Sequence, residues 1–258
     1  MKKTVIALLL AMVLVLSLGA CGGEEESAEG EAVVYKVGTE PTFPPFDTTD
    51  EDQNIVGLDM DLITAIGEDQ GFEVEFENLS FDGLIPALQS GNIDIVAAGM
   101  NKDDKERQEQ VDFSDAYYES KLMVAVTEEN EDIQSVDDLT PDMKVAAQTG
   151  TTGASKVQEL ADQGQIGEAV ILDGLDTCMM QLINGDVSAV INDKPVTEAY
   201  MNKQPGKIKM VGDPLNAENY GFAVAKGNEE LLEKINAGLK NIQEDGTFDE
   251  LIDKWFNQ

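Results

Sequence analysis

The sequence predicts an α/β protein with two parallel-sheet lobes, and three observations support this fold class. From Val33 onward, short apolar runs alternate with stretches of helical periodicity, which is typical of βαβ units. The length of 258 residues allows one large domain or two domains of roughly 100 to 150 residues. Hydrophobic residues make up 42% of the chain, which is enough for a sizeable core.

The strands are predicted from apolar or alternating runs that are bounded by polar and glycine-containing segments. Glu73–Asn78 alternates like a half-buried strand, whereas Asp94–Ala98 reads as a fully buried one. In chain order, the predicted strands are Val33–Gly38, Glu73–Asn78, Asp94–Ala98, Leu122–Val126, Val145–Ala147, Ala169–Leu172, Ala189–Asn192 and Tyr220–Ala225.

The helices are predicted from apolar residues that recur at helical spacing, and Gly91 and Gly185 end two of them. The apolar stripes are Leu58, Leu62, Ala65 and Ile66; Phe81, Ile85 and Leu88; Val157, Leu160 and Ala161; Leu175, Met179, Leu182 and Ile183; and Leu231, Ile235, Leu239 and Ile242.

The first 20 residues are predicted to be an export signal. Lys2 and Lys3 precede the apolar run Val5–Leu16, whose 12 residues are fewer than the ~20 that a membrane-spanning helix needs. The run ends in Leu18-Gly19-Ala20-Cys21, which resembles the lipobox of bacterial lipoproteins. That resemblance implies cleavage before Cys21 and its lipidation; the alternative is an ordinary signal with a chance cysteine.

Residues 21–32 are interpreted as a lipidated, acidic tether. They contain five glutamates and no large apolar side chain, so they cannot bury enough surface to fold. We therefore expect the folded part of the chain to stay near the outer face of the cell membrane, anchored and not spanning.

Composition excludes several classes of function. The formal net charge is −34, so the chain lacks the basic surface that nucleic-acid binding requires. Histidine is absent, which excludes histidine-dependent catalytic pairs and metal sites. Cys21 and Cys178 are too few for a disulfide framework or a structural zinc site. We expect no cofactor, no metal and no nucleic-acid partner.

Several segments together resemble the type II periplasmic (extracellular) solute-binding proteins, in the branch of polar amino acid ABC transporters. The resemblance spans Val34–Phe256. The segments that carry it are Gly38–Phe46 (GTEPTFPPF), Val56–Leu62 (VGLDMDL), Phe81–Leu88 (FDGLIPAL), Val111–Ser114 (VDFS), Asp245–Asp249 (DGTFD) and Lys254–Phe256 (KWF).

The resemblance implies a two-lobed α/β fold with a ligand cleft between the lobes and two crossover strands that act as a hinge. We place the crossovers near Lys121–Ala125 and Tyr220–Ala225. The expected division is a first part of lobe 1 at 33–121, lobe 2 at 122–219 and a second part of lobe 1 at 220–258.

Arg107 is the leading candidate for binding the ligand's α-carboxylate. It is the single arginine among 17 basic residues, and only arginine offers a planar fork that binds a carboxylate with two hydrogen bonds. Its place before Val111–Ser114 matches the family's spacing. The alternative is a solvated arginine in the charged run Asp103–Glu109.

Gly150-Thr151-Thr152-Gly153 follows a predicted strand and opens a helix, so Thr151 and Thr152 can bind an anion there. A helix cap by threonine is a compatible alternative. The resemblance adds Gly99 and Asn101 to the carboxylate site. However, Asn101 stands where a threonine is usual, and the segment 101–106 is one residue longer than the common pattern, which puts the local backbone in question.

Asp193 follows a predicted strand and matches the aspartate that accepts the ligand's α-ammonium in the family. The alternative is a helix cap, since Pro195 follows closely. Phe43 and Phe81 match aromatic residues that enclose the ligand side chain, with Glu40 near its far end. Both phenylalanines could instead belong to the core, and this alternative is stronger for Phe81.

Two further patterns have structural interpretations. Asp50, Asp52, Asn54 and Asp61 have the spacing of a calcium loop, but Ile55 stands where the motif needs glycine. An acidic hairpin is therefore favoured over a calcium site. Cys178 lies on an apolar helix face and is expected to be a buried, inert thiol.

The function expected from these residues is that of a monomeric receptor without catalytic residues. It would capture a free amino acid and deliver it to an ABC transporter permease and its ATPase subunit. Glu40 between two aromatic rings favours arginine or lysine, followed by glutamine or another polar amino acid. The alternatives are an enzyme on the same fold, such as an extracytoplasmic dehydratase, and a ligand-sensing receptor domain.

Overall fold

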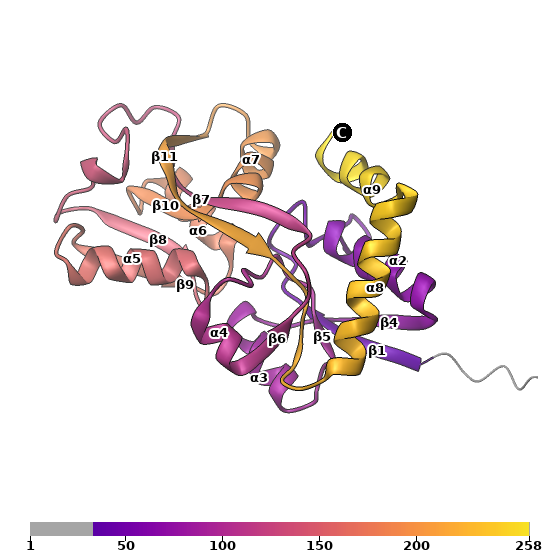
Figure 1. Ribbon diagram of the computed structural model, residues 1–258. Helices are drawn as coiled ribbons and strands as arrows, with labels where there is room; N and C mark the ends of the chain where they lie inside the picture. Colours follow the sequence, from indigo (N-terminus) through magenta and orange to yellow (C-terminus); the bar gives the residue numbers. More distant parts are fainter. Residues whose placement is uncertain (1–32, 258) are drawn as a thin grey trace, which may run out of the picture. The chain divides into compact units, whose positions relative to one another are not determined.

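The computed structural model describes residues 33–257, and these form two five-stranded sheets with helices packed around them (Figure 1). The export signal, Cys21 and the tether lie outside the described residues. The first sheet has the order β4-β1-β5-β12-β6 and consists of β1 (Val33–Thr39), β4 (Phe72–Asn78), β5 (Ile95–Val96), β6 (Val111–Phe113) and β12 (Ala223–Ala225). The second sheet has the order β11-β7-β10-β8-β9 and consists of β7 (Tyr118–Thr127), β8 (Lys144–Gln148), β9 (Glu168–Leu172), β10 (Ala189–Asp193) and β11 (Ile208–Tyr220).

The helices of the described residues connect these strands or cover the sheets. They are α2 (Leu58–Gln70), α3 (Phe81–Gln89), α4 (Lys105–Gln110), α5 (Thr152–Asp162), α6 (Leu175–Asn184), α7 (Lys194–Lys203), α8 (Glu229–Asp245) and α9 (Thr247–Phe256), with a short 3-10 helix at Val136–Asp138. None of the helices in the range 33–257 is long and apolar enough to cross a membrane.

Both sheets are mixed, which differs from the parallel sheets expected from the sequence. β1 runs parallel to β4 and β5, but β12 is antiparallel to β5 and β6. Likewise, β10, β8 and β9 are parallel, but β7 is antiparallel to β10 and β11. The antiparallel strands β7 and β12 each follow a crossing between the sheets, so they join their sheet without the helical crossover that parallel strands need.

The chain crosses between the sheets twice, at 114–117 and at 221–222. The first crossing lies upstream of the expected Lys121–Ala125, because Leu122 and Ala125 already pair with β10. Beside the crossings, β7 and β11 form an antiparallel ribbon in which Tyr118 faces Tyr220. The two connections therefore run side by side, as a hinge requires.

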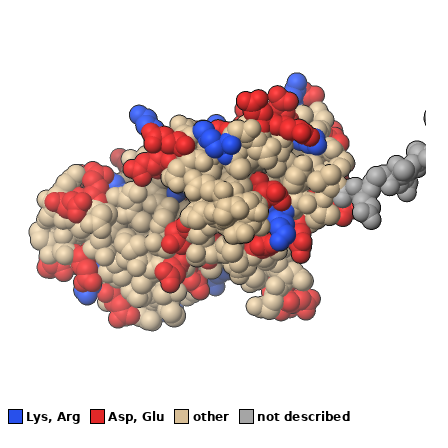
Figure 2. Space-filling model, turned by 90° about the horizontal axis from the view of Figure 1, so that it is seen from below, with Lys and Arg blue, Asp and Glu red and all other residues tan. Residues whose placement is uncertain are grey.

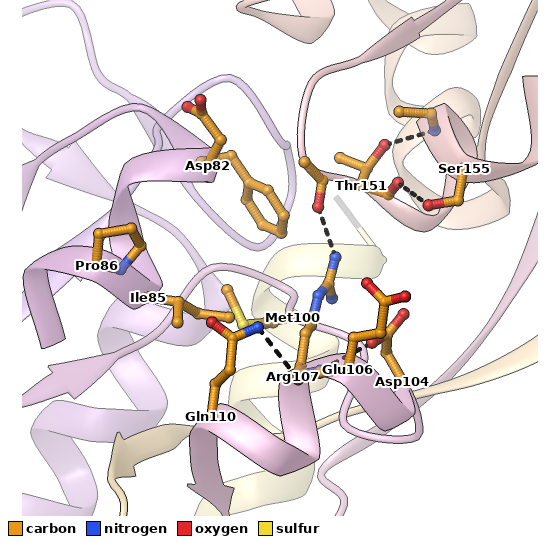
Figure 3. Close-up of a pocket in the computed structure, with 13 residues that line it drawn as sticks. Asp82, Ile85, Pro86, Met100, Asp104, Glu106, Arg107, Gln110, Thr151 and Ser155 are labelled. Atoms are coloured by element: carbon orange, nitrogen blue, oxygen red, sulfur yellow. Dashed lines mark hydrogen bonds between the residues drawn. The ribbon is translucent and has the colours of Figure 1, made fainter. Parts of the chain in front are cut away.

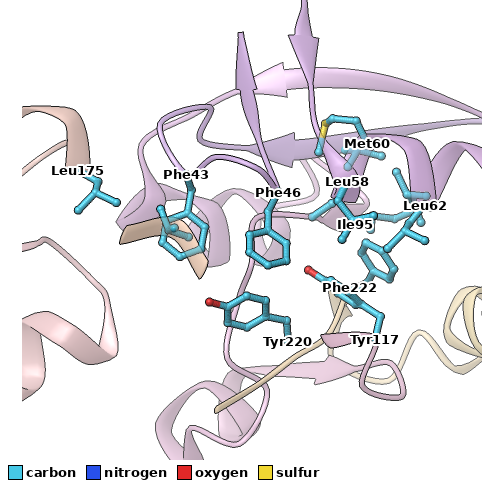
Figure 4. Packing of buried hydrophobic residues seen from close by; sticks show 14 of the residues in the cluster. Phe43, Phe46, Leu58, Met60, Leu62, Ile95, Tyr117, Leu175, Tyr220 and Phe222 are labelled. Atoms are coloured by element: carbon cyan, nitrogen blue, oxygen red, sulfur yellow. The ribbon is translucent and has the colours of Figure 1, made fainter. Parts of the chain in front are cut away.

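Aromatic residues form the part of the core that lies beneath these connections (Figure 4). The ring of Phe46 is fully buried and lies 4.9 Å from Tyr118 and 5.0 Å from Tyr220, measured between ring centroids. Phe256, near the end of α9, stacks on Tyr118 at 5.2 Å. Burying each such ring contributes roughly 1.5–3 kcal/mol, so these rings stabilise the region where the chain crosses between the sheets.

The predicted closing helix is observed as α8, and its apolar stripe packs on α2. Asn228 begins α8 by accepting a hydrogen bond from the backbone of Leu231. Gly238 permits close approach of the two helices, since a Cβ there would lie 2.8 Å from a side-chain carbon of Ile66. Figure 1 shows α8 beside α2, with α9 continuing past it.

The residues with calcium-loop spacing have two separate structural roles. The Asp50 carboxylate accepts hydrogen bonds from the backbones of Asp52 (2.9 Å) and Asn54 (2.8 Å), which shape the hairpin of β2 (Thr48–Thr49) and β3 (Ile55–Val56). Asp61 lies on α2 and binds Lys254 and Trp255 of α9. Within residues 33–257 no group of acidic residues is placed to hold a metal ion.

Candidate functional site

A small cavity between the two sheets brings the predicted site residues together. It is lined by Glu40, Phe43, Phe81, Gly99, Asn101, Arg107, Gln148, Thr151, Thr152, Asp193 and Glu218. All predicted ligand-contacting residues are in this set, and Gln148 and Glu218 are additions that sequence reasoning missed. The free volume is about 20 Å³, close to the space that one water molecule needs. An amino acid therefore enters only if the lining residues move apart.

Arg107 is buried in the site and is not a solvated surface residue. Asp104 caps α4 by accepting a hydrogen bond from the backbone of Arg107 at 2.9 Å. The guanidinium reaches from α4 toward the start of α5 (Figure 3), where Nη2 donates to the carbonyl of Gly150 at 2.9 Å. It also lies 5.3 Å from the centre of the Phe81 ring. Burial lowers the pKa of Arg107.

The Arg107 guanidinium has carbonyl acceptors in place of a carboxylate partner. Its second bond, from Nη1, goes to the carbonyl of Asn101 at 3.3 Å. Among the ion pairs of the described residues, none involves Arg107. A buried cation without an ionic partner is costly, so this position is suited to an anionic ligand group.

The start of α5 supplies backbone donors next to Arg107. Thr151 caps the helix: its hydroxyl accepts from the backbone of Ala154 at 3.0 Å and donates to the carbonyl of Gln148 at 2.7 Å. Its side chain is therefore committed to the cap, while Thr152 is the first helical residue and lines the cavity. Amide groups at a helix start favour an anion.

Gly99 and Asn101 form a tight loop beside the aromatic floor. Gly99 has a φ of 54°, and a Cβ there would lie 2.6 Å from the Phe43 ring. Its N–H donates to the buried carboxylate of Asp59 at 2.7 Å, and burial raises the pKa of Asp59 to about 7. The side-chain oxygen of Asn101 accepts from the backbone of Asp103 at 3.0 Å. This bond shapes the longer loop and leaves the Asn101 NH₂ group as a donor.

Phe43 and Phe81 both line the cavity and combine core and site roles. The Phe43 side chain is 8% exposed and belongs to the main apolar cluster, while its ring covers Gly99. Phe81 begins α3, packs partly against a smaller apolar cluster and lies under Arg107. The sequence left open whether each phenylalanine belongs to the core or to the site. In the structure, both residues belong to both.

Asp193 faces the cavity and does not cap α7 with its side chain. Its carboxylate accepts from the hydroxyls of Ser120 at 2.8 Å and Tyr220 at 2.6 Å, and it makes no cap bond to α7. The helix-cap alternative is correct in position, since Asp193 directly precedes α7 and Pro195 lies in its first turn, but the Asp193 side chain makes no cap hydrogen bond. Burial, followed by repulsion from Glu218, raises the pKa of Asp193 to about 8.

Glu218 is a second buried carboxyl group beside Asp193. It is 1% exposed, and its Oε1 accepts from the amide of Asn216 at 3.0 Å. The sequence offered one signal for it: Glu218, Tyr220 and Phe222 alternate, so they share one face of an extended segment. The predicted strand began at Tyr220, two residues too late to include it.

Glu40 is linked to the second sheet at the other end of the cavity. Its Oε2 accepts from the amide of Gln148 at 2.9 Å and from the hydroxyl of Thr42 at 2.8 Å. Thr42 in turn accepts hydrogen bonds from the backbone of Leu175 (3.3 Å) and the hydroxyl of Tyr200 (3.0 Å). Burial raises the pKa of Glu40. Gln148 directly follows the apolar run Val145–Ala147, which was its sequence signal.

Cys178 lies apart from these groups, buried on α6 as expected. It is a free thiol, and burial raises its pKa to about 12. A thiol with so high a pKa is unreactive at neutral pH, so it has no part in the site.

The chain is similar to known solute-binding proteins. Residues 35–258 match the family of bacterial extracellular solute-binding proteins, family 3. The chain is 34% identical to a probable histidine-binding protein of Neisseria gonorrhoeae, over 99% of this chain and 96% of that protein. It is 32% identical to putative ABC transporter arginine-binding protein 2 of Escherichia coli, over 100% of both chains.

Solved structures of ancestral arginine-binding proteins have the same fold. One that is bound to arginine has 44% sequence identity and a TM-score of 0.82, and the match covers 86% of this chain and 98% of that chain. Another, bound to glutamine, has 43% identity and a TM-score of 0.82, with 89% and 100% of the two chains covered.

Proposed function

Because the chain belongs to family 3 of the bacterial extracellular solute-binding proteins, we propose that its ligand is a cationic amino acid, arginine or lysine. Like its relatives, the chain is an amino-acid-binding protein of an ABC transporter. It is not an enzyme. The substrate within that class is the part that needs an argument from the site.

The observation that carries the cationic assignment is the charge balance of the cavity. Three buried carboxyl groups, from Glu40, Asp193 and Glu218, line the same small space as one guanidinium, from Arg107. A ligand with one carboxylate and two cationic groups compensates this excess of acid better than a neutral amino acid does, because buried charges need partners.

The proposed pose follows from which groups lack an ionic partner. The α-carboxylate binds Arg107 through two hydrogen bonds and contacts the first amides of α5, with the Asn101 NH₂ and the Gly99 loop beside it. The α-ammonium binds Asp193. The side chain passes between Phe43 and Phe81, and its cationic end reaches Glu40. Each aromatic ring attracts a desolvated cation by roughly 0.5–2 kcal/mol.

Glutamine is the second candidate, and the bond between Gln148 and Glu40 favours it. That bond at 2.9 Å demonstrates that the Glu40 carboxylate accepts from an amide group, and the amide of a bound glutamine could take the place of Gln148. An ancestral arginine-binding protein has also been solved with glutamine bound. This candidate keeps the α-carboxylate and α-ammonium contacts unchanged.

A thermal-shift screen over the twenty amino acids, followed by calorimetric titration of those that stabilise the protein, tests the proposal. Binding stabilises the folded chain by RT ln(1 + [L]/Kd), so at equal concentration the ligand of highest affinity raises the melting temperature most. We expect arginine or lysine to give the largest shift. A larger shift and a tighter Kd for glutamine would replace the cationic assignment by the second candidate.

Export and lipidation of Cys21 are part of the same proposal. The apolar run Val5–Leu16 and the small residues before Cys21 support a cleaved lipoprotein signal. Acidic side chains are spread over the face seen in Figure 2, and basic ones are few, which favours approach of cations from solution. Mass spectrometry of the membrane fraction, with Cys21→Ala as the comparison, tests the lipid attachment.

We further propose that the protein works as a monomer that closes on its ligand. The cavity is lined by residues of one chain. The separate sheets and the two crossings support the division into lobe 1 at 33–121 and 220–258 and lobe 2 at 122–219. The boundaries shift to the crossings at 114–117 and 221–222, because β7 begins at Tyr118 and β11 ends at Tyr220. Because the cavity is too small for an amino acid as it stands, ligand entry requires hinge opening at the crossings.

A further inference from the structure

The carboxyl groups of Asp193 and Glu218 form a buried pair at one side of the cavity. Glu218 lies on β11, and Asp193 ends β10 on the far side of β7. Ser120 of β7 links them: it is the Cα partner of Glu218 in the ribbon of β7 and β11, and its hydroxyl donates to Asp193. Both carboxyl groups are buried and line the same cavity of about 20 Å³, so they repel each other and one of them holds a proton.

The groups around the two carboxyl groups are mostly neutral hydrogen-bond donors and not cations. From β7, the hydroxyl of Ser120 donates to Asp193, and from β11 the hydroxyl of Tyr220 does the same. Asn216 of β11 donates to Glu218. Arg107 of α4 is the cation that acts on both carboxyl groups, but its guanidinium bonds go to the carbonyls of Asn101 and Gly150.

The charge state of the pair follows from this arrangement. Burial and the neighbouring Glu218 raise the pKa of Asp193 to about 8, against the stabilising hydrogen bonds from Tyr220 and Ser120. The phenol of Tyr220 has its own pKa raised well above the usual value by burial and by Asp193, so it stays a neutral donor. At neutral pH the pair therefore retains one proton.

We propose that Glu218 is a second carboxylate of the ammonium subsite, and that the α-ammonium of the bound amino acid displaces the proton shared by Asp193 and Glu218. The ammonium brings one positive charge and the proton leaves to solvent, so the net charge of the pair and its partner is unchanged. This proposal rests on the assignment of Asp193 to the α-ammonium, and it holds for any amino acid side chain.

Proton release makes the affinity depend on pH with a definite sign. Below the pKa of the pair the proton competes with the ammonium, so the affinity rises with pH by up to about tenfold per pH unit, and it levels off near pH 8. Between pH 6 and pH 7 we therefore expect a Kd that falls by about tenfold. A site with one ionised aspartate would show almost no change in this range.

The experiment is calorimetric titration of the mature chain with arginine and, separately, with glutamine, at pH 7 in phosphate and in Tris buffer. The difference in observed enthalpy between buffers of different ionisation enthalpy gives the number of protons released. We expect about one proton for the wild type with each amino acid. In Glu218→Gln the release should become clearly smaller and the Kd should change less with pH, because the repulsion that Glu218 adds to the effect of burial on Asp193 is removed.

The control is Glu119→Gln, which makes the same change at an exposed position on the adjacent strand β7 and should release protons like the wild type. Binding without proton release in the wild type overturns the proposal but leaves amino acid binding intact. Release in Glu218→Gln that equals the wild-type release overturns the role of Glu218 and assigns the proton to another group. Thermal unfolding checks that the variant folds; if it does not, the wild-type proton count alone decides.

Discussion

The two sheets are joined in two places beside the cavity. At the first, which we call the Arg107 end, the link is a buried guanidinium. At the second, which we call the Glu40 end, the links are hydrogen bonds of Thr42 and of the Glu40 carboxylate. Arg107 makes the first connection with a bond to the Gly150 carbonyl. Thr42 makes the second with bonds from Leu175 and Tyr200, while Gln148 reaches Glu40. The first end leaves a positive charge without an ionic partner. At the Glu40 end, Glu40 and Thr42 already have hydrogen-bond partners.

This difference separates two tasks in amino acid recognition. The Arg107 end needs an anion to compensate its charge, so it should contribute most of the affinity and should act alike on every amino acid. At the Glu40 end the carboxylate already accepts hydrogen bonds. A ligand side chain therefore gains binding free energy there only by the amount that its new bond exceeds the bond it replaces. That end should decide which amino acid binds.

The largest effect is expected from Arg107→Ala. It removes two charge-assisted hydrogen bonds and leaves the ligand carboxylate buried without a partner, at a cost of about 3 to 5 kcal/mol. The affinity should fall by more than about a hundredfold for arginine and glutamine alike, as measured by calorimetry. Arg107→Lys should recover only part of the loss, because a point charge cannot form the fork.

Lys105→Ala is the matched control, since Lys105 is an exposed cation on the same helix α4. It should bind like the wild type. Near-wild-type affinity in Arg107→Ala would remove the distinction between the two ends altogether.

A smaller, ligand-selective effect is expected from Glu40→Gln. The change keeps hydrogen-bonding capacity but removes the charge, so a cationic ligand should bind about tenfold or more weakly, on the order of 1.4 kcal/mol. A neutral amino acid should be barely affected. Parallel titrations with arginine, lysine and glutamine measure the difference, and Glu75→Gln at an exposed position of β4 serves as the control. An equal loss for all ligands would refute the selective role of this end.

A still smaller and non-selective effect is expected from Tyr200→Phe. It removes the hydroxyl that donates to the carbonyl of Thr42 across the cavity, worth about 0.5–1.5 kcal/mol. The affinity should fall by at most about tenfold and by the same factor for arginine and glutamine, because the bond joins the sheets without touching the ligand. A loss confined to one amino acid would instead assign Tyr200 to side-chain recognition.

The last prediction concerns the motion that both ends share. Small-angle scattering should give a smaller radius of gyration with saturating arginine than without it, because hinge closure at the crossings brings the lobes together. The decrease should be absent in Arg107→Ala at the same arginine concentration. An unchanged radius in the wild type would mean that the lobes are closed in both states.

The sequence predicted the Arg107 end better than the Glu40 end, for a physical reason. A lone arginine before a family motif, and a glycine-threonine turn between strand and helix, are local signals that can be read along the chain. The bond between Glu40 and Gln148 joins residues that are 108 positions apart, and Gln148 looks like the ordinary polar end of a strand. Only the assembled fold brings them together.

Asp193 and Glu218 illustrate the same limit in another form. The local sequence around Asp193 left a helix cap open as an alternative, and the hydrogen bonds from Ser120 and Tyr220 come from other strands. The direction of each strand within its sheet also could not be predicted from local sequence patterns. Strand periodicity does not reveal whether the next strand is reached through a helix or through a short crossing, so β7 and β12 were expected to be parallel.

The position of β12 in the first sheet has a consequence for the order in which the chain can fold. β12 lies between β5 and β6 and pairs with both, although those two strands are made more than 100 residues earlier. Before Ala223–Ala225 is available, β5 and β6 have no partner at that edge, whereas the second sheet is complete by Tyr220. During synthesis from the N-terminus, the first sheet therefore stays divided between β5 and β6 until Ala225 has emerged, and the second sheet is completed only shortly before it, at Tyr220.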